Sequence, residues 1–125
     1  MYKYQPKRPV KSFQDLDVYQ QTHNLAIKVA KHSQLAPTAL EIPKLIATAH
    51  SIRFADQNQA IANLEQAMLN CNLMVVYLDQ YRDLKTLPII EVEQISKDYL
   101  TVRRKILNLQ RSWQKFMNIN KLNQK

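Results

Sequence analysis

The sequence predicts an all-α fold, an antiparallel up-down bundle of four helices. The first observation is that the 125 residues include no glycine, whereas tight hairpin turns and phosphate-binding loops need glycine's conformational freedom. The second is that apolar residues recur three or four positions apart over long segments, which is typical of amphipathic helices. The third is that proline or capping residues separate these segments. Together they exclude sheet-rich folds and Walker- or Rossmann-type nucleotide enzymes.

The first and third helices have recognisable start signals. Ser12 with Asp15 forms a capping pair, which predicts a first helix over residues 13–32. Asp56 caps the third helix, which we expect to end at residues 83–85. The inward row of that third helix steps by three and four residues, through Ile61, Leu64, Met68, Cys71, Val75 and Leu78.

Prolines indicate where the second and fourth helices begin. Pro37 interrupts the pattern after the first helix, and Pro43 belongs in a first turn. Thr38 with Glu41 repeats the capping spacing and predicts a second helix that starts after Thr38, while Pro43 leaves open a start of the regular helix nearer Ile42. We expect this helix to end near Phe54. The fourth helix is expected after Pro88 and through about Asn118. Its apolar row is Val92, Ile95, Tyr99, Val102, Ile106, Leu109, Trp113 and Phe116.

The net charge of +8 is concentrated at the two ends of the chain. Residues 1–11 form a basic arm of charge +4, residues 99–125 carry +7 without one acid, and residues 12–98 carry −3. These limits divide the chain into an arm (1–11), a helix bundle (12–119) and a basic tail (120–125).

The charge pattern predicts a nucleic-acid interface on the fourth helix. Lys97, Arg104 and Arg111 are seven residues apart and Lys115 lies one turn further, so these four share one face opposite the apolar row. Such a row can follow a phosphate backbone and release its counterions. The remaining candidate contacts flank this row or lie in the arm, and they are Arg103, Lys105, Lys7, Arg8 and Lys11. Two alternatives stay open, a merely solvated face and docking of an acidic protein.

Residue types that carry catalysis or bind metals show no suitable spacing. His23, His32 and His50 are not spaced as metal ligands, no Glu-x-x-His pair occurs, and the lone Cys71 belongs to an apolar row. We therefore expect no enzyme activity, no metal and no cofactor. Neither a secretory signal nor an apolar run long enough to span a membrane is present, which predicts a cytoplasmic protein without a membrane partner.

Several segments resemble one family of bacterial four-helix bundles. Residues 13–20, Phe-Gln-Asp-Leu-Asp-Val-Tyr-Gln, resemble the opening helix of the 23S rRNA intervening-sequence proteins. Ile42-Pro43-Lys44 and residues 63–67, 78–84 and 106–115 resemble their relatives, the accessory variability determinant (Avd) proteins of diversity-generating retroelements. The Avd branch fits better, although Gln110 and Ser112 stand where glycines are typical.

The resemblance to Avd proteins implies a function and an assembly. It implies a non-enzymatic protein that forms a pentameric barrel, binds a reverse transcriptase together with RNA or DNA, and supports mutagenic cDNA synthesis. Tyr77, Trp113 and Phe116 are candidate contacts between copies of the chain, and the alternative for Tyr77 and Trp113 is packing inside one copy. The alternative is an interaction module of the intervening-sequence family that docks an acidic partner through the same basic surface.

Overall fold

The computed structural model describes residues 10–123, with side chains up to residue 118. This part of the chain folds into one 3-10 turn and four α-helices, which confirms the predicted all-helical class with four helices. The elements are η1 (Phe13–Asp15), α1 (Asp17–Val29), α2 (Ala36–Ile52), α3 (Gln57–Asp83) and α4 (Ile89–Asn123).

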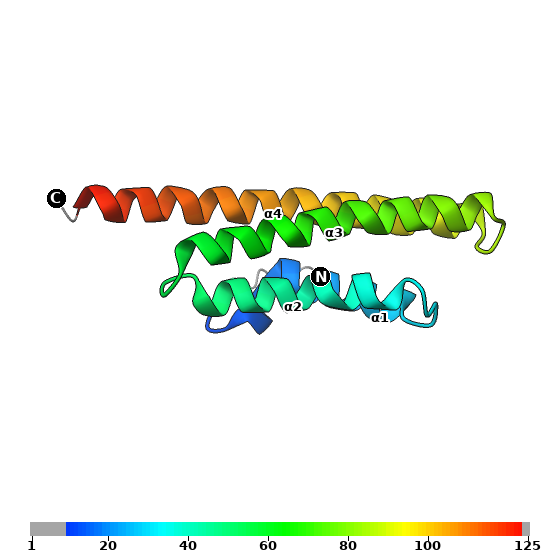
Figure 1. Ribbon diagram of the computed structural model, residues 1–125, viewed down its shortest axis with the longest axis horizontal. Coiled ribbons are helices and arrows are strands. Elements are labelled where there is room, and N and C mark those ends of the chain that lie inside the picture. Colours follow the sequence, from blue (N-terminus) through cyan, green and yellow to red (C-terminus); the bar gives the residue numbers. More distant parts are fainter. Residues whose placement is uncertain (1–9, 124–125) are drawn as a thin grey trace, which may run out of the picture.

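The four helices surround one core (Figure 1). Each helix packs against the next one in the chain, and α1 closes the ring against α4, whereas the backbones of the diagonal pairs α1–α3 and α2–α4 stay further apart. The helices differ in length, from about 20 Å for α1 to about 52 Å for α4 at 1.5 Å per residue. The C-terminal end of α4 therefore projects past the α2–α3 link (Figure 1).

The first helix begins later and ends earlier than the predicted range of residues 13–32. The Ser12–Asp15 capping box is present, but it caps η1 and not α1. Leu16 then adopts an extended conformation, with φ −70° and ψ 128°, and buries its side chain in the core. The gain from burying Leu16 interrupts the helix, so α1 starts at Asp17 and ends at Val29.

Both predicted starts of the second helix, after Thr38 and near Ile42, lie too late in the sequence. Helix α2 begins at Ala36, because Pro37 occupies its first turn, where the missing amide hydrogen costs nothing. Pro43 lies inside the helix and is buried. It removes one backbone hydrogen bond there, and the burial of Ala39, Ile42 and Ile46 around it compensates for that loss.

The link between α3 and α4 is a turn without glycine. Helix α3 starts as predicted, since the Asp56 carboxylate accepts a hydrogen bond from the Gln59 amide at 3.1 Å. After α3 ends at Asp83, Lys85 adopts a left-handed conformation with φ 57°, the position that glycine usually fills. Pro88 then precedes α4.

The inward row of α4 departs from the prediction beyond Ile106. Val92, Ile95, Tyr99, Val102 and Ile106 are buried as expected. Beyond them Leu109 and Trp113 still pack against the core but are only partly buried, Gln110 and Met117 are buried, and Phe116 is exposed. A straight α-helix rotates by about 20° for every seven residues relative to a strict heptad. Over the two heptads from Val102 to Phe116 this rotation reaches about 40°. Phe116 therefore turns toward solvent, and Gln110 turns toward the core. Helix α4 also continues to Asn123, into the segment predicted as a tail.

Cys71 of α3 is expected to resist thiol reagents in the native protein. Burial raises the pKa of the thiol to about 12, against a smaller lowering effect of the Arg103 charge. A rise from 9.0 to about 12 reduces the thiolate fraction at slightly basic pH by roughly a thousandfold. Alkylation of the folded protein should therefore be much slower than that of the urea-unfolded protein. Equal rates would contradict the burial of Cys71, and C71A/N72C, with its thiol on the exposed neighbour, is the control for fast reaction.

Candidate nucleic-acid interface

Four cationic side chains form a continuous exposed row on the outer face of α4, which we call the α4 stripe. Its members are Lys97, Arg104, Arg111 and Lys115, all of them exposed. The stripe points away from the buried row of Tyr99, and it extends over roughly 27 Å at 1.5 Å per residue. Among the side chains that the structure describes, none of the four has a carboxylate within 4.0 Å. The stripe is therefore free to bind an anion.

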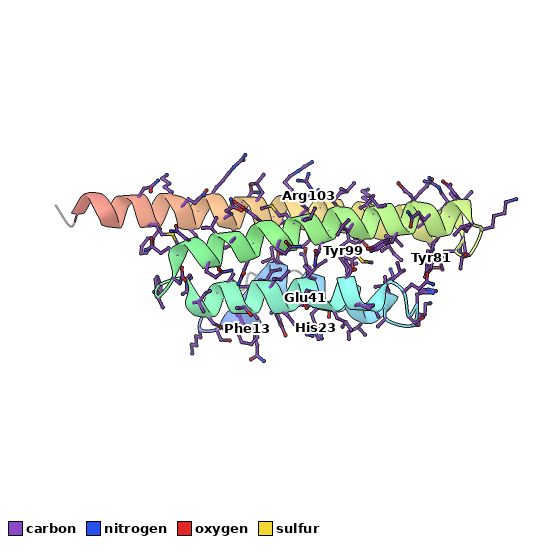
Figure 2. All side chains as sticks on the ribbon, in the orientation of Figure 1. Phe13, His23, Glu41, Tyr81, Tyr99 and Arg103 are labelled. Atoms are coloured by element: carbon purple, nitrogen blue, oxygen red, sulfur yellow. The ribbon has the colours of Figure 1, made fainter. Side chains whose placement is uncertain are left out.

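The two flanking cations of α4 have partners or positions that separate them from the stripe. The ammonium of Lys105 lies 3.1 Å from the Asp17 carboxylate of α1. Arg103 turns toward α3, is half-buried, and acts electrostatically on Cys71. Figure 2 labels Arg103 on α4, and it labels Tyr99, a fully buried residue, between the two helix pairs. We therefore expect Lys105 and Arg103 to add to the positive potential around α4 and to make few direct contacts with an anionic ligand.

The predicted arm residues are only partly within the described range. Lys7 and Arg8 lie outside it. Lys11 is exposed, and its backbone amide donates a hydrogen bond to the Asp15 carboxylate at 3.0 Å. The η1 turn that follows Lys11 packs against α1 and α2 and has no contact with α4. The structure thus does not bring Lys11 onto the α4 stripe.

Acidic groups weaken one end of the α4 stripe. A groove of about 510 Å³ between α3 and α4 is lined by Lys97 and Arg104 together with Asp79 and Glu93. Glu93 lies one helical turn before Lys97, whereas residues 99–125 contain no acid at all. The positive potential therefore increases along α4 toward Arg111 and Lys115. This gradient favours contacts with a polyanion on the C-terminal half of the helix.

A small apolar hollow lies beside that C-terminal half, where the α2–α3 link meets the projecting end of α4. We call it the aromatic hollow. Its volume is about 200 Å³, and its lining residues are Arg53, Phe54, Ser112, Trp113, Phe116 and Met117. The Arg53 guanidinium carbon lies 4.2 Å from the centre of the Phe54 ring, a cation–π contact. Phe54 is 69% exposed and Phe116 is 52% exposed, so two phenyl rings face solvent here.

The three predicted interface residues differ in accessibility. Phe116 is exposed and belongs to the aromatic hollow. Trp113 is half-buried against the core, with its ring centre 6.3 Å from that of His50. Tyr77 is half-buried and also packs against the core. Of the three, Phe116 offers the most surface to a partner.

Sequence reasoning missed Phe54 and Arg53 as surface features. Phe54 was predicted only as the end of the second helix, because its partners on α4 are nearly sixty residues away in the sequence. The sequence shows only that an arginine and an aromatic residue, Arg53 and Phe54, stand next to each other just before the Asp56 cap. It does not reveal that the pair lies against Trp113 and Phe116.

Acid pH is expected to destabilise the protein through His50. Burial lowers the pKa of this imidazole below 6.5, and the nearby Arg53 charge lowers it further. In this range the unfolded chain binds a proton more readily than the folded one. The stability contributed by neutral His50 is therefore complete above pH 6.5 and is lost as the pH falls through the lower folded-state pKa.

Urea unfolding between about pH 7.5 and about pH 5 measures this effect. The wild type should show a falling midpoint over this range, and His50→Gln should reduce the fall. His23→Gln is the matched control, because His23 is exposed on α1. An identical pH dependence for the wild type and His50→Gln would show that another group is responsible.

The described part of the chain contains no group of three or more His, Cys, Asp or Glu side chains arranged to hold a metal ion. Within the same described residues, no helix has both the length and the hydropathy of a membrane span. Comparisons with known proteins found no matching family model, no matching curated protein and no matching solved structure. The resemblance to Avd proteins therefore stays a prediction.

Proposed function

We propose that the protein is a non-catalytic accessory protein that binds nucleic acid through the α4 stripe. The observation that carries this proposal is the set of four exposed cations on one helix face without a carboxylate partner among the described side chains. The core occupies the opposite face of α4, so the helix can present its cations without losing its packing. Contacts of this kind read the phosphate backbone and not the base sequence.

The biological setting that we propose is a diversity-generating retroelement. The resemblance to Avd proteins supports a role beside a reverse transcriptase, with template RNA or cDNA as the nucleic acid. The same resemblance supports assembly into a pentamer. The short links between helices that pack side by side support an antiparallel up-down order within each copy. Copurification of the full chain with a retroelement reverse transcriptase tests this setting.

Salt dependence tests the nucleic-acid proposal directly. Anisotropy of a labelled duplex, measured with increasing salt, should show log affinity falling linearly with log salt. Four phosphate contacts per duplex site predict a slope of about −3.6. Light scattering on the same preparation gives the number of copies in the particle. A chain that binds no nucleic acid even at low salt would contradict the proposal.

An acidic protein is the second candidate partner for the same surface. Leu100, 43% exposed, lies between Lys97 and Arg104 in the groove between α3 and α4, and a protein surface would cover this leucine better than a phosphate chain would. This alternative predicts salt-sensitive capture of an acidic protein and negligible affinity for RNA or duplex DNA.

A further inference from the structure

The aromatic hollow exposes more ring surface than the packing of the bundle requires. Most large apolar side chains of the described chain lie in one core cluster, whereas Phe54 and Phe116 both face solvent at the same place. Adjacent exposed aromatic rings beside a concave apolar surface are typical of a binding site. A partner that binds here is therefore expected to offer flat apolar groups to the two rings.

The charges around the aromatic hollow point to an anionic partner. Ser112 lines the hollow, and it directly follows Arg111 and precedes Lys115 by three residues, so the hollow adjoins the α4 stripe on the helix surface. Arg53 adds a third positive charge at the Phe54 ring. The nearest acid in the link is Asp56, and its carboxylate is engaged by the Gln59 amide at the start of α3.

We propose that the aromatic hollow takes unpaired bases of a single-stranded nucleic acid whose phosphates follow the C-terminal half of the α4 stripe. This inference rests on the proposed function and adds the substrate class. Sequence-tolerant binding of single strands combines a basic path for the backbone with aromatic rings on which bases stack. Arg111 and Phe116 are about 8 Å apart along the helix axis and about 140° apart around it, with Lys115 between them, so a strand that reaches both curves round α4 past Lys115. A duplex keeps its bases stacked inside and cannot offer them to Phe54 or Phe116.

The only tryptophan of the chain reports on this site. Trp113 lines the aromatic hollow, so a base that enters should change its fluorescence. We expect an oligouridine strand to quench Trp113 on binding, and a blunt-ended duplex without a loop, of the same number of nucleotides, to leave the emission unchanged. The single strand should also bind more tightly than the duplex at the same salt concentration.

Substitution of the two exposed rings separates stacking from charge. F54A/F116A should lower affinity for the single strand by about tenfold or more and leave affinity for the duplex unchanged. F54L/F116L keeps apolar side chains without ring faces, and we expect the same loss. L84A/I90A is the matched control, because Leu84 and Ile90 are even more exposed than the two phenylalanines but lie around the α3–α4 link, at the other end of the bundle (Figure 1). This control should bind like the wild type.

The possible failures are distinguishable. Equal affinity for single strand and duplex, with no change in Trp113 emission, would overturn the base-binding site and leave the proposed function intact. Absence of binding to either would overturn both. Wild-type affinity of F54L/F116L for the single strand would indicate a purely apolar contact and contradict stacking. A change in particle mass for F54A/F116A without a change in affinity would show that a second copy of the chain covers the hollow.

Discussion

Reversing two charges of the α4 stripe, with Arg104→Glu and Arg111→Glu together, is expected to weaken nucleic-acid binding on the order of a hundredfold at moderate salt. Both side chains are exposed and have no carboxylate within 4.0 Å among the described side chains. The substitutions remove two cation–phosphate contacts and replace them with repulsion. Losing two contacts should also make the slope of log affinity against log salt shallower by about 1.8.

The matched control for this double variant is Lys28→Glu with Lys44→Glu. It changes the net charge by the same amount, but its two lysines are exposed on α1 and α2. If only overall charge matters, both double variants should lose affinity equally. If the stripe is the site, the control should keep most of its affinity. Lys105→Ala is a second control, expected to have a small effect because Lys105 faces Asp17 at 3.1 Å.

The loss of binding should be similar for all nucleic-acid sequences. The stripe can contact phosphates, and phosphate contacts position a protein without reading bases. A variant that lost affinity for one sequence only would therefore indicate base readout elsewhere. Unchanged binding by R104E/R111E would mean that the nucleic-acid interface does not lie on α4. Circular dichroism of each variant checks that the helices remain folded.

The α4 stripe was predictable because it depends on local geometry alone. Seven-residue spacing places Lys97, Arg104 and Arg111 on one side of any helix, and the apolar row marks the opposite side as buried. The same reasoning predicted the Asp56 cap, whose carboxylate acts three residues away. Features that involve neighbouring turns of one helix were therefore accessible from the sequence.

Features that join distant segments were not accessible in this way. The Lys105–Asp17 pair connects residues that are 88 positions apart, and the aromatic hollow joins the α2–α3 link to the end of α4. The start of α2 was missed for a related reason. Pro37 is as compatible with a first helical turn as with a break, and the packing of Ala39 and Ile42 decides between them.

Ile106→Ala is expected to be among the most destabilising single substitutions in the chain, by about 2–5 kcal/mol in the free energy of unfolding. Ile106 is fully buried, and α4 contacts both α3 and α1. Alanine would remove apolar contacts and leave a cavity that the surrounding helices fill only in part. A loss of this size is a large share of the 5–15 kcal/mol typical of a folded domain.

The same substitution at Ile90 of the same helix is the control. Ile90 is 83% exposed, so Ile90→Ala should change stability by no more than about 0.5 kcal/mol. Urea unfolding followed by circular dichroism measures both variants, with equal m-values showing that the unfolded states are comparable. Because alanine favours the helix in both cases, a difference between them isolates the effect of burial. Equal stability of the two variants would mean that Ile106 does not lie in a packed core, and the outward orientation of the α4 stripe would lose its basis.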